Sequence, residues 1–449
     1  MANPAPPGPV SPARAVAAAA LVRVFTADAF ASAALDAEIG RASLDPRDAA
    51  LATELVYGVL RVEGLLDARL AELATRREYA KDAAVRAHLL MGAYSILFLD
   101  RVPAFAAVSE AVAGARAAGG ERTAGFANAV LRRLASAAAA GPRPALTEAA
   151  LASAPGWLRG ALRRSLGRAG AAAYLGAGPV PPPIGLCLAQ GEDRAAWIAA
   201  LAAAAPGATI EAGAVSPRAI LVRGAGDVRR LPGAGKAWIV QEEGAQVVTL
   251  LAGARPGERV LDACAGHGNK TWLLAQEVEG GGAVDASDIH PHKLSELRSG
   301  PAGINARGTY AVNWAAGTGE VPGGYDLVVV DAPCSGVGTL RRRPEIALRR
   351  TVEDLPRLAA LQEAIARQAA TRARAGGRLV YAVCSVLREE GEEVAERLAS
   401  GDAPGVRLEP APFASEIGRA LAGEAPSLRL LPHVQGTDGY FVASFIVRD

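Results

Sequence analysis

From about residue 236 onward, the chain alternates short apolar runs with stretches of helical spacing. Runs of β-branched residues bounded by glycine, proline and serine predict buried strands, and strands that alternate with helices form a parallel sheet. The candidate strands are residues 259–262, 283–288, 309–312, 326–330, 378–383 and 440–447. No helical pattern follows the last strand, so we expect it to insert antiparallel, as a late edge strand. The sequence therefore predicts an α/β domain over residues 236–449.

The region before residue 141 is predicted to be all-helical. Apolar residues recur at helical spacing throughout residues 13–140, with breaks at Asp45-Pro46, Pro103 and Gly119-Gly120. Such a region could fold alone as a helical domain. The proline-rich residues 1–12 that precede it are predicted to be disordered.

The region between these two parts has a mixed pattern. Within residues 141–235, the stretch from Trp197 has helical spacing, and residues 219–223 have the composition of a strand. Proline-rich connectors, such as residues 179–183, separate these pieces. We therefore expect a small α/β linker domain.

Composition excludes several classes of site. Four cysteines without Cys-x-x-Cys spacing, and only five histidines, speak against a structural zinc site and a disulfide framework. Reduced thiols are typical of cytoplasmic proteins. No apolar run reaches the roughly 18 residues that a membrane-spanning helix needs. We therefore expect a cytoplasmic protein without membrane contact and without a bound metal.

A glycine-containing loop follows the first strand of the α/β domain and opens a helix. In this loop, residues 262–271, glycines let backbone amides approach a ligand, and the helix N-terminus favours negative charge. Asp288 ends the second strand, where a carboxylate binds a ribose in nucleotide-binding α/β folds. A phosphate-binding Walker loop needs glycine where Asn269 stands, and a dinucleotide fold wants a third glycine near Leu273. The remaining alternative is a tight turn without a ligand.

Two cysteines follow apolar runs that are predicted to be strands. Cys334 lies in the sequence Asp-Ala-Pro-Cys-Ser-Gly after strand 326–330, and Cys384 directly follows strand 378–383. Open α/β sheets bind ligands beyond the carboxyl ends of their strands, so both thiols are expected to face one ligand. The alternative is that both are small buried hydrophobic residues. A basic stretch that suits a phosphate backbone follows Cys334 and comprises Arg341, Arg342 and Arg343.

These motifs resemble those of a known family. Residues 331–345, 384–385 and 437–441 are similar to the RNA 5-methylcytosine methyltransferases, and the whole chain is similar to their bacterial small-subunit ribosomal RNA type (Sun/Fmu or RsmB). Residues 48–61 and 125–133 resemble the NusB-like RNA-binding domain of those enzymes. The resemblance implies an all-α NusB-like domain, a small α/β linker domain and a Rossmann-like class I methyltransferase domain with a seven-stranded sheet. It also implies S-adenosylmethionine as cofactor.

The resemblance further implies the roles of individual residues. Cys384 would be the nucleophile, Cys334 would assist product release, and Asp331 would contact the target base. A thiolate that adds to C6 of cytosine makes C5 able to attack a methyl group, and loss of the C5 proton then releases the thiolate. The cofactor-binding residues implied are Cys264, Ala265, Gly266, His267, Gly268, Asn269, Lys270, Asp288, Asn313 and Asp331.

The expected activity is methylation of C5 of a cytosine in RNA, namely 16S ribosomal RNA, by a monomer. In the cofactor loop, Gly266-His267-Gly268-Asn269 departs from the family's usual Ala-Pro-Gly-Gly, and Asn313 replaces an acid. Two alternatives therefore stay open: a non-catalytic RNA-binding or ribosome-assembly factor, and a paralogue that acts on another RNA. A DNA cytosine methyltransferase is disfavoured because it has no evident need for Cys384 or for a NusB-like domain.

Overall fold

The computed structural model describes residues 10–74, 78–299, 306–401 and 406–449, which form two compact units. The first unit contains the described residues up to Gly160, together with Arg168–Pro181 and Leu340–Arg350. The second contains Ala161–Gly167, Pro182–Thr339 and Thr351–Asp449. Most of the segment predicted to be disordered, as far as residue 9, lies outside the described residues.

The first unit is helical, as predicted. Its helices are α1 (Pro12–Thr26), α2 (Ala31–Ala42), α3 (Pro46–Arg61), α4 (Glu63–Leu73), α5 (Ala83–Phe98), α6 (Ala104–Ala140), α7 (Leu146–Ser153), most of α8 (Gly156–Ala177), and α13 (Ile346–Arg349). The predicted breaks are confirmed. Asp45 caps α3 by accepting a hydrogen bond from the Asp48 amide, and Pro46 takes the first helical position, where its missing N–H costs nothing. Pro103 precedes α6, and Gly120 interrupts α6 with a φ of 77°.

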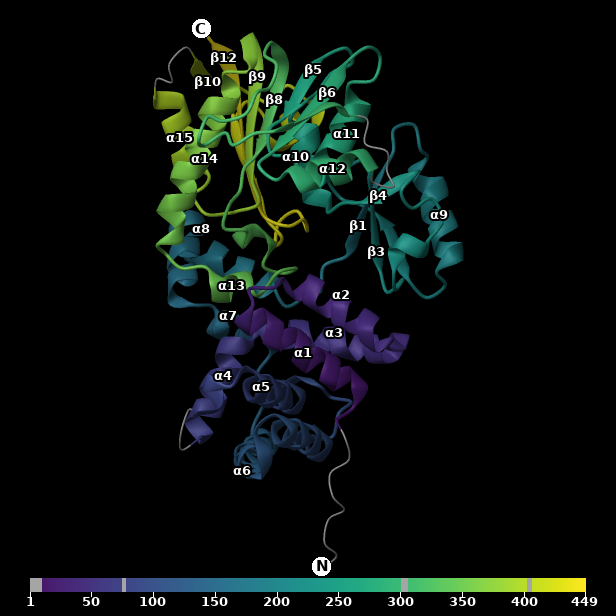
Figure 1. The fold of residues 1–449 in the computed structure, drawn as a ribbon, viewed down its shortest axis with the longest axis vertical. Coiled ribbons are helices and arrows are strands. Elements are labelled where there is room, and N and C mark those ends of the chain that lie inside the picture. Colours follow the sequence, from purple (N-terminus) through teal and green to yellow (C-terminus); the bar gives the residue numbers. More distant parts are fainter. Residues whose placement is uncertain (1–9, 75–77, 300–305, 402–405) are drawn as a thin grey trace, which may run out of the picture. The chain divides into compact units, whose positions relative to one another are not determined.

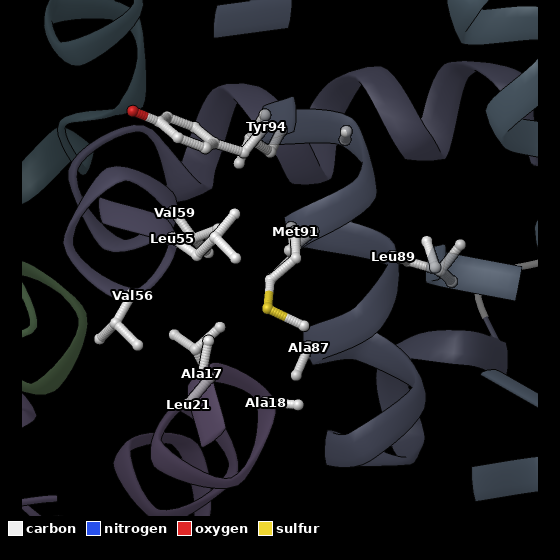
Figure 2. Close-up of a cluster of buried hydrophobic side chains, with 14 of the residues drawn as sticks. Ala17, Ala18, Leu21, Leu55, Val56, Val59, Ala87, Leu89, Met91 and Tyr94 are labelled. Carbon is white, nitrogen blue, oxygen red and sulfur yellow. The ribbon is translucent and has the colours of Figure 1, made fainter. Parts of the chain in front are cut away.

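The helices of this unit enclose an apolar core. Helix α5 packs against α1, α3 and α6 and is buried on most of its circumference. Figure 2 shows the centre of the core, where Leu21 of α1, Leu55 and Val59 of α3 and Met91 of α5 lie around one another. The ring of Tyr94 is buried beside them, and its hydroxyl points away from the aliphatic side chains to donate to Glu54 (Figure 2). A buried hydroxyl needs such a partner.

The second unit begins with a small antiparallel sheet. Its strands are β1 (Ile184–Leu188), β2 (Thr209–Ala212), β3 (Ala219–Arg223) and β4 (Trp238–Val240), in the order β2-β3-β1-β4. Helix α9 (Arg194–Ala204) contributes Leu201 to the apolar cluster on this sheet. The helix and the strand predicted here are both present. The predicted boundaries at residues 140 and 235 stay predictions.

The second sheet is large and mixed. Its strands are β5 (Arg259–Asp262), β6 (Ala283–Asp288), β7 (Ala306–Ala311), β8 (Tyr325–Asp331), β9 (Ala373–Val383), β10 (Arg407–Pro410), β11 (Ser427–Leu430) and β12 (Tyr440–Arg448). Seven of them follow the order β10-β12-β9-β8-β5-β6-β7, and β11 pairs with β12 outside this path. The five strands β5 to β9 pair in parallel, which confirms the predicted sheet.

The last strand differs in one respect from its prediction. Strand β12 is antiparallel to β9, as expected. It is not an edge strand, because β10 and β11 also pair with it. These two strands are short and partly polar, so neither has the long apolar run by which a strand is found in a sequence.

Helices cover both faces of this sheet (Figure 1). Val328 and Val330 of β8 pack in one apolar cluster with residues of α14 (Asp354–Ala370) and α15 (Glu392–Ser400). Leu327 and Val329 of the same strand pack in another cluster, with α10 (Glu243–Leu251) and α11 (Asn269–Glu277). Successive side chains of a strand point to opposite faces, so apolar residues throughout β8 are what a doubly covered sheet requires. Within the described ranges, no helix is long and apolar enough to cross a membrane.

Candidate functional site

The candidate site lies where the strand order of the large sheet reverses. From β5 the chain proceeds through β6 to β7 in one direction, and it returns to β8 and β9 on the other side of β5. Ligands of open α/β sheets bind at such a switch point, beyond the carboxyl ends of the strands. Lys270, at the start of α11, and Asp331, the last residue of β8, form an ion pair here, with Nζ 2.6 Å from Oδ2.

The electrostatics of this pair keep the Lys270 ammonium group charged. Burial by itself lowers the pKa of Lys270, but the Asp331 carboxylate outweighs burial, and the pKa of Lys270 is raised overall. Cys384 contributes to the same rise, so the ammonium group lies within electrostatic reach of that thiol. The structure thus brings together three residues that the sequence analysis assigned to the site.

The predicted cofactor loop is a tight turn held to the second strand. Gly266 and Gly268 have φ angles of 56° and 83°, which glycine adopts without strain. The Gly266 amide donates to Oδ2 of Asp288 over 2.9 Å, and the His290 amide donates to Oδ1 over 2.8 Å. These two bonds orient the Asp288 carboxylate at the end of β6, where the sequence analysis placed it.

Asn313 and Trp314 follow the third strand beside this loop. The Val312 amide donates to the Asp288 carbonyl over 3.1 Å, and the Trp314 indole donates to the Ala263 carbonyl over 2.8 Å. The amide oxygen of Asn313 accepts a hydrogen bond from the Ala316 amide. The glycine turn, the Asp288 carboxylate and the Asn313 amide are therefore neighbours, and their donors and acceptors fit a nucleoside-containing cofactor.

Other members of the predicted cofactor set differ in environment. Burial raises the pKa of the Cys264 thiol well above its ordinary range, so this cysteine is neutral and packs beside the apolar core. The exposed His267 points its Nδ1 at the Glu296 carboxylate, 3.0 Å away. Asn269 is exposed, and its Nδ2 is 3.4 Å from the Val240 carbonyl.

Asp262 lies at the end of β5, and the sequence analysis gave it no role. Its side chain is buried, and it accepts a hydrogen bond of 2.7 Å from the Thr271 hydroxyl. Burial raises its pKa to about 6, although that hydrogen bond and Lys270 act in the opposite direction. A buried carboxylate under a ligand loop is typical of functional sites, where perturbed groups gather.

The two cysteines are in contact. Cys334 follows β8 and Cys384 follows β9, the neighbouring strand, and their Sγ atoms are 3.2 Å apart. The hydrogen bond with Cys384, together with burial, raises the pKa of Cys334 well above its ordinary range. The structure therefore confirms the prediction that neighbouring strands bring both thiols to one point.

Three segments that the sequence analysis quoted separately meet behind these thiols. The Gly338 amide donates to the Cys384 carbonyl over 3.0 Å, and the Gly439 amide donates to the Gly338 carbonyl over 2.8 Å. A Cβ atom on Gly338 would lie 1.9 Å from the Gly439 carbonyl oxygen, so only glycine fits. Gly391 is similarly constrained, because a Cβ there would lie 2.8 Å from the Phe441 ring.

The arginines after Cys334 belong to the first unit, within Leu340–Arg350. The guanidinium group of Arg343 stacks on Phe30, with its carbon atom 5.2 Å from the ring centroid. The buried Glu345 accepts a hydrogen bond of 3.1 Å from the Ala31 amide at the start of α2. The structure therefore packs this basic segment on the N-terminal helices, and its role toward RNA stays a prediction.

Among the described residues, no cluster of three or more histidine, cysteine and acidic side chains could hold a metal ion.

Comparisons with known proteins agree with this geometry. The sequence pattern of the 16S rRNA methyltransferase RsmB/F family matches residues 248–446, and that of the NusB family matches residues 11–136. The protein named ribosomal RNA small subunit methyltransferase B in Pseudomonas putida is 32% identical, over 96% of this chain and 98% of its own length. Rv1407 of Mycobacterium tuberculosis, named as a methyltransferase, is 34% identical over 97% of this chain and 96% of its own length.

A solved structure shares the fold over nearly the whole chain. The crystal structure of PH0851 superposes with a TM-score of 0.78 and covers 98% of this chain and 99% of its own, at 20% identity. This structural similarity supports the assignment of the fold, and the sequence matches support the assignment of the family. Because relatives above 30% identity cover almost all of it, the chain belongs to the 16S rRNA methyltransferase RsmB/F family, whose members depend on S-adenosylmethionine.

Proposed function

We propose that this protein methylates C5 of a cytosine in small-subunit (16S) ribosomal RNA through a covalent cysteine adduct. The observation that carries the proposal is the contact between the Cys334 and Cys384 thiols, 3.2 Å apart at the carboxyl ends of adjacent parallel strands. Two thiols in this position suit a reaction that forms and then breaks a bond between sulfur and a base.

Cys384 is the nucleophile in this proposal. Its thiolate adds to C6 of the cytosine, which gives C5 the character of an enamine carbon. The charged Lys270 lies within electrostatic reach of Cys384. S-Adenosylmethionine supplies an electrophilic methyl group when it is bound.

Cys334 acts in the release of product. Its raised pKa, caused by the hydrogen bond to Cys384 and by burial, keeps Cys334 as a neutral thiol. A neutral thiol is a poor nucleophile, which supports giving Cys334 a role other than attack. A base must accept the C5 proton so that the C5–H electron pair can expel the Cys384 sulfur from C6, and Cys334 is in contact with that sulfur.

The groups around the thiols have matching tasks. Asp331 bonds to Lys270 with Oδ2, which leaves lone pairs that can accept hydrogen bonds from the target base. The glycine turn at Gly266 and Gly268 would hold the cofactor, with Asp288 at a ribose and Asn313 contributing its side-chain amide. The target base must leave any stack to reach this site, which favours unpaired cytosines.

RNA is the proposed partner of both units. The NusB-family match over residues 11–136 suggests an RNA-binding role for the helical unit, and Arg341 and Arg343 are candidates for phosphate contacts. We propose that the protein acts in the cytoplasm, because ribosomal RNA is a cytoplasmic substrate. We also propose that it is a monomer.

A second candidate function is a non-catalytic assembly factor. It is favoured by the altered cofactor loop, in which His267 is exposed and pairs with Glu296. Calorimetry with S-adenosylmethionine separates the two functions, because an assembly factor whose loop has decayed will not bind the cofactor at millimolar concentration.

The mechanism is tested with labelled cofactor and ribosomal RNA that lacks the modification. Cys334→Ala is expected to accumulate a covalent protein–RNA adduct that survives denaturing electrophoresis, and Cys384→Ala is expected to form none. The matched control is Cys187→Ala, which removes a buried thiol from β1 and should behave like wild type. The opposite pattern in the first two variants would exchange their roles, and no adduct in any variant would refute the covalent mechanism.

A further inference from the structure

A fully buried carboxylate lies directly behind the loop that carries Cys334. Glu390 follows Cys384 in the connection from β9 to α15, and no part of it is exposed. Its Oε1 accepts hydrogen bonds from the Ser335 amide over 2.7 Å and from Nε2 of Gln362 over 3.0 Å. Its Oε2 accepts a hydrogen bond from the Ser335 hydroxyl. A buried polar group requires such partners.

The same network holds the loop on the other side of the cysteine. Nε2 of Gln362, on α14, also donates to the Pro333 carbonyl over 3.0 Å. The buried Tyr381 hydroxyl donates to the Glu390 carbonyl and lies 3.1 Å from Oε1 of Gln362. Burial raises the pKa of Tyr381 well above its ordinary range, so the hydroxyl remains a donor. A fully satisfied network of buried polar groups makes the backbone around it rigid.

The residues on both sides of Cys334 are therefore fixed through one side chain. Pro333 and Ser335 are bound to Glu390 directly or through Gln362, and the Ser335 hydroxyl lies 3.4 Å from that of Ser385, which follows Cys384. The distance between the two thiols depends on where this loop lies relative to the end of β9.

We propose that Glu390 is a positioning residue that holds Cys334 against Cys384 and thereby sets the rate of product release. The predicted effect of Glu390 on product release rests on the proposed covalent mechanism. Its structural part, the placement of one thiol against the other, is independent of that mechanism. The described hydrogen bonds of the Glu390 side chain go to Ser335 and Gln362, its charge distribution also contributes to the raised pKa of Cys334, and it is not exposed to a substrate.

The experiment compares three substitutions of Glu390 with one control in the full chain. Glu390→Ala removes every acceptor, and Glu390→Asp keeps the carboxyl group but is one methylene too short to reach its donors. Glu390→Gln keeps an oxygen for the Ser335 amide and is expected to rescue function in part. Glu393→Ala, in the first turn of α15, removes a half-exposed carboxylate that pairs with Arg388.

The first measurement is the rate at which mild oxidation with diamide joins Cys334 to Cys384, followed by peptide mass spectrometry. Two thiols lose their protons and two electrons to diamide, which is reduced to the hydrazine, and the disulfide forms. We expect this rate to fall by about tenfold or more in Glu390→Ala and Glu390→Asp, because a thiol displaced by an ångström or so loses up to roughly 100-fold in rate. Glu393→Ala should match wild type. Unchanged disulfide formation in Glu390→Ala and Glu390→Asp overturns the proposal.

The second measurement is the amount of covalent protein–RNA adduct. Glu390→Ala or Glu390→Asp should accumulate adduct as Cys334→Ala does, while binding S-adenosylmethionine with wild-type affinity, which a general loss of folding would not allow. If disulfide formation slows but no variant forms an adduct, the positioning role stands and the covalent mechanism fails. If adduct accumulates in Cys334→Ala alone, the covalent mechanism stands and the claim that Glu390 sets the rate of product release fails.

Discussion

The buried Asp262 should make the stability of the protein depend on pH in a direction opposite to that of most carboxylates. The side chain is 1% exposed at the end of β5, and its pKa rises from the ordinary 3.8 to about 6 in the folded protein, with burial as the main cause. An unfolded chain exposes this group to water, so its pKa there is the ordinary one. Asp262→Asn removes the titration and leaves the hydrogen-bonding shape nearly unchanged.

The sign and size of the effect follow from proton binding. Between pH 3.8 and about 6, the folded protein binds more protons at Asp262 than the unfolded chain does. The free energy of unfolding that this group contributes therefore falls as pH rises through that window, and it is constant above it. The contribution of Asp262 to the free energy of unfolding changes by about 3 kcal/mol in total, and about 2 kcal/mol of this change occurs between about pH 4.5 and about pH 8.

The assay is urea unfolding of wild type and Asp262→Asn over this pH range, followed by tryptophan fluorescence. Trp272 and Trp314 report on the same unit as Asp262. As pH rises from one end of this range to the other, the free energy of unfolding of Asp262→Asn should increase by about 2 kcal/mol relative to that of wild type. Any constant effect of the new amide on stability cancels in this comparison. A difference that does not vary with pH would refute the account of this site.

Asp326 provides the control, because its pKa shifts the other way. Burial alone would raise the pKa of Asp326, but hydrogen bonds from the Arg259 amide and from Arg374 lower it overall. The stability it contributes is present above pH 3.8 and is lost only below that value. The difference between wild type and Asp326→Asn should therefore be constant over the range in which Asp262→Asn varies.

Two further substitutions, each with a control substitution, test the packing around the site and the placement of the basic segment. Gly338→Ala would put a methyl group 1.9 Å from the Gly439 carbonyl oxygen, so we expect a loss of about 1–3 kcal/mol in urea unfolding and slower methyl transfer. Gly125→Ala, which meets no atom within 4 Å in a helix, should instead be neutral or stabilising. Phe30→Ala should destabilise by about 1–2 kcal/mol because two arginines stack on the ring, while Phe105→Ala, 79% exposed, should have little effect.

The sequence predicted the parts of the site that depend on the order of the strands. Cys334, Cys384 and Asp288 each stand at the end of an apolar run, and parallel pairing brings the ends of such runs to one edge of a sheet. The helical breaks at Pro46 and Gly120 were predictable for a similar reason, because proline and glycine act on the backbone locally.

The parts that the sequence did not predict depend on contacts between distant segments. Glu390 is one acid among several after Cys384, and only the folded chain places it behind Ser335. The segment Leu340–Arg350 looks like a solvated basic loop, yet it packs on helices more than 270 residues earlier in the chain, as the contact of Arg341 with Arg61 illustrates. Charge and spacing give no sign of a partner that far away.

The central claim is that this protein places a methyl group on C5 of a cytosine in small-subunit ribosomal RNA. It is tested most directly by mapping 5-methylcytosine in ribosomal RNA from cells with and without the gene, and from cells that carry only Cys384→Ala. The account predicts one cytosine that is methylated with the wild-type gene and unmethylated in the other two strains. An identical 5-methylcytosine pattern in all three strains would contradict it.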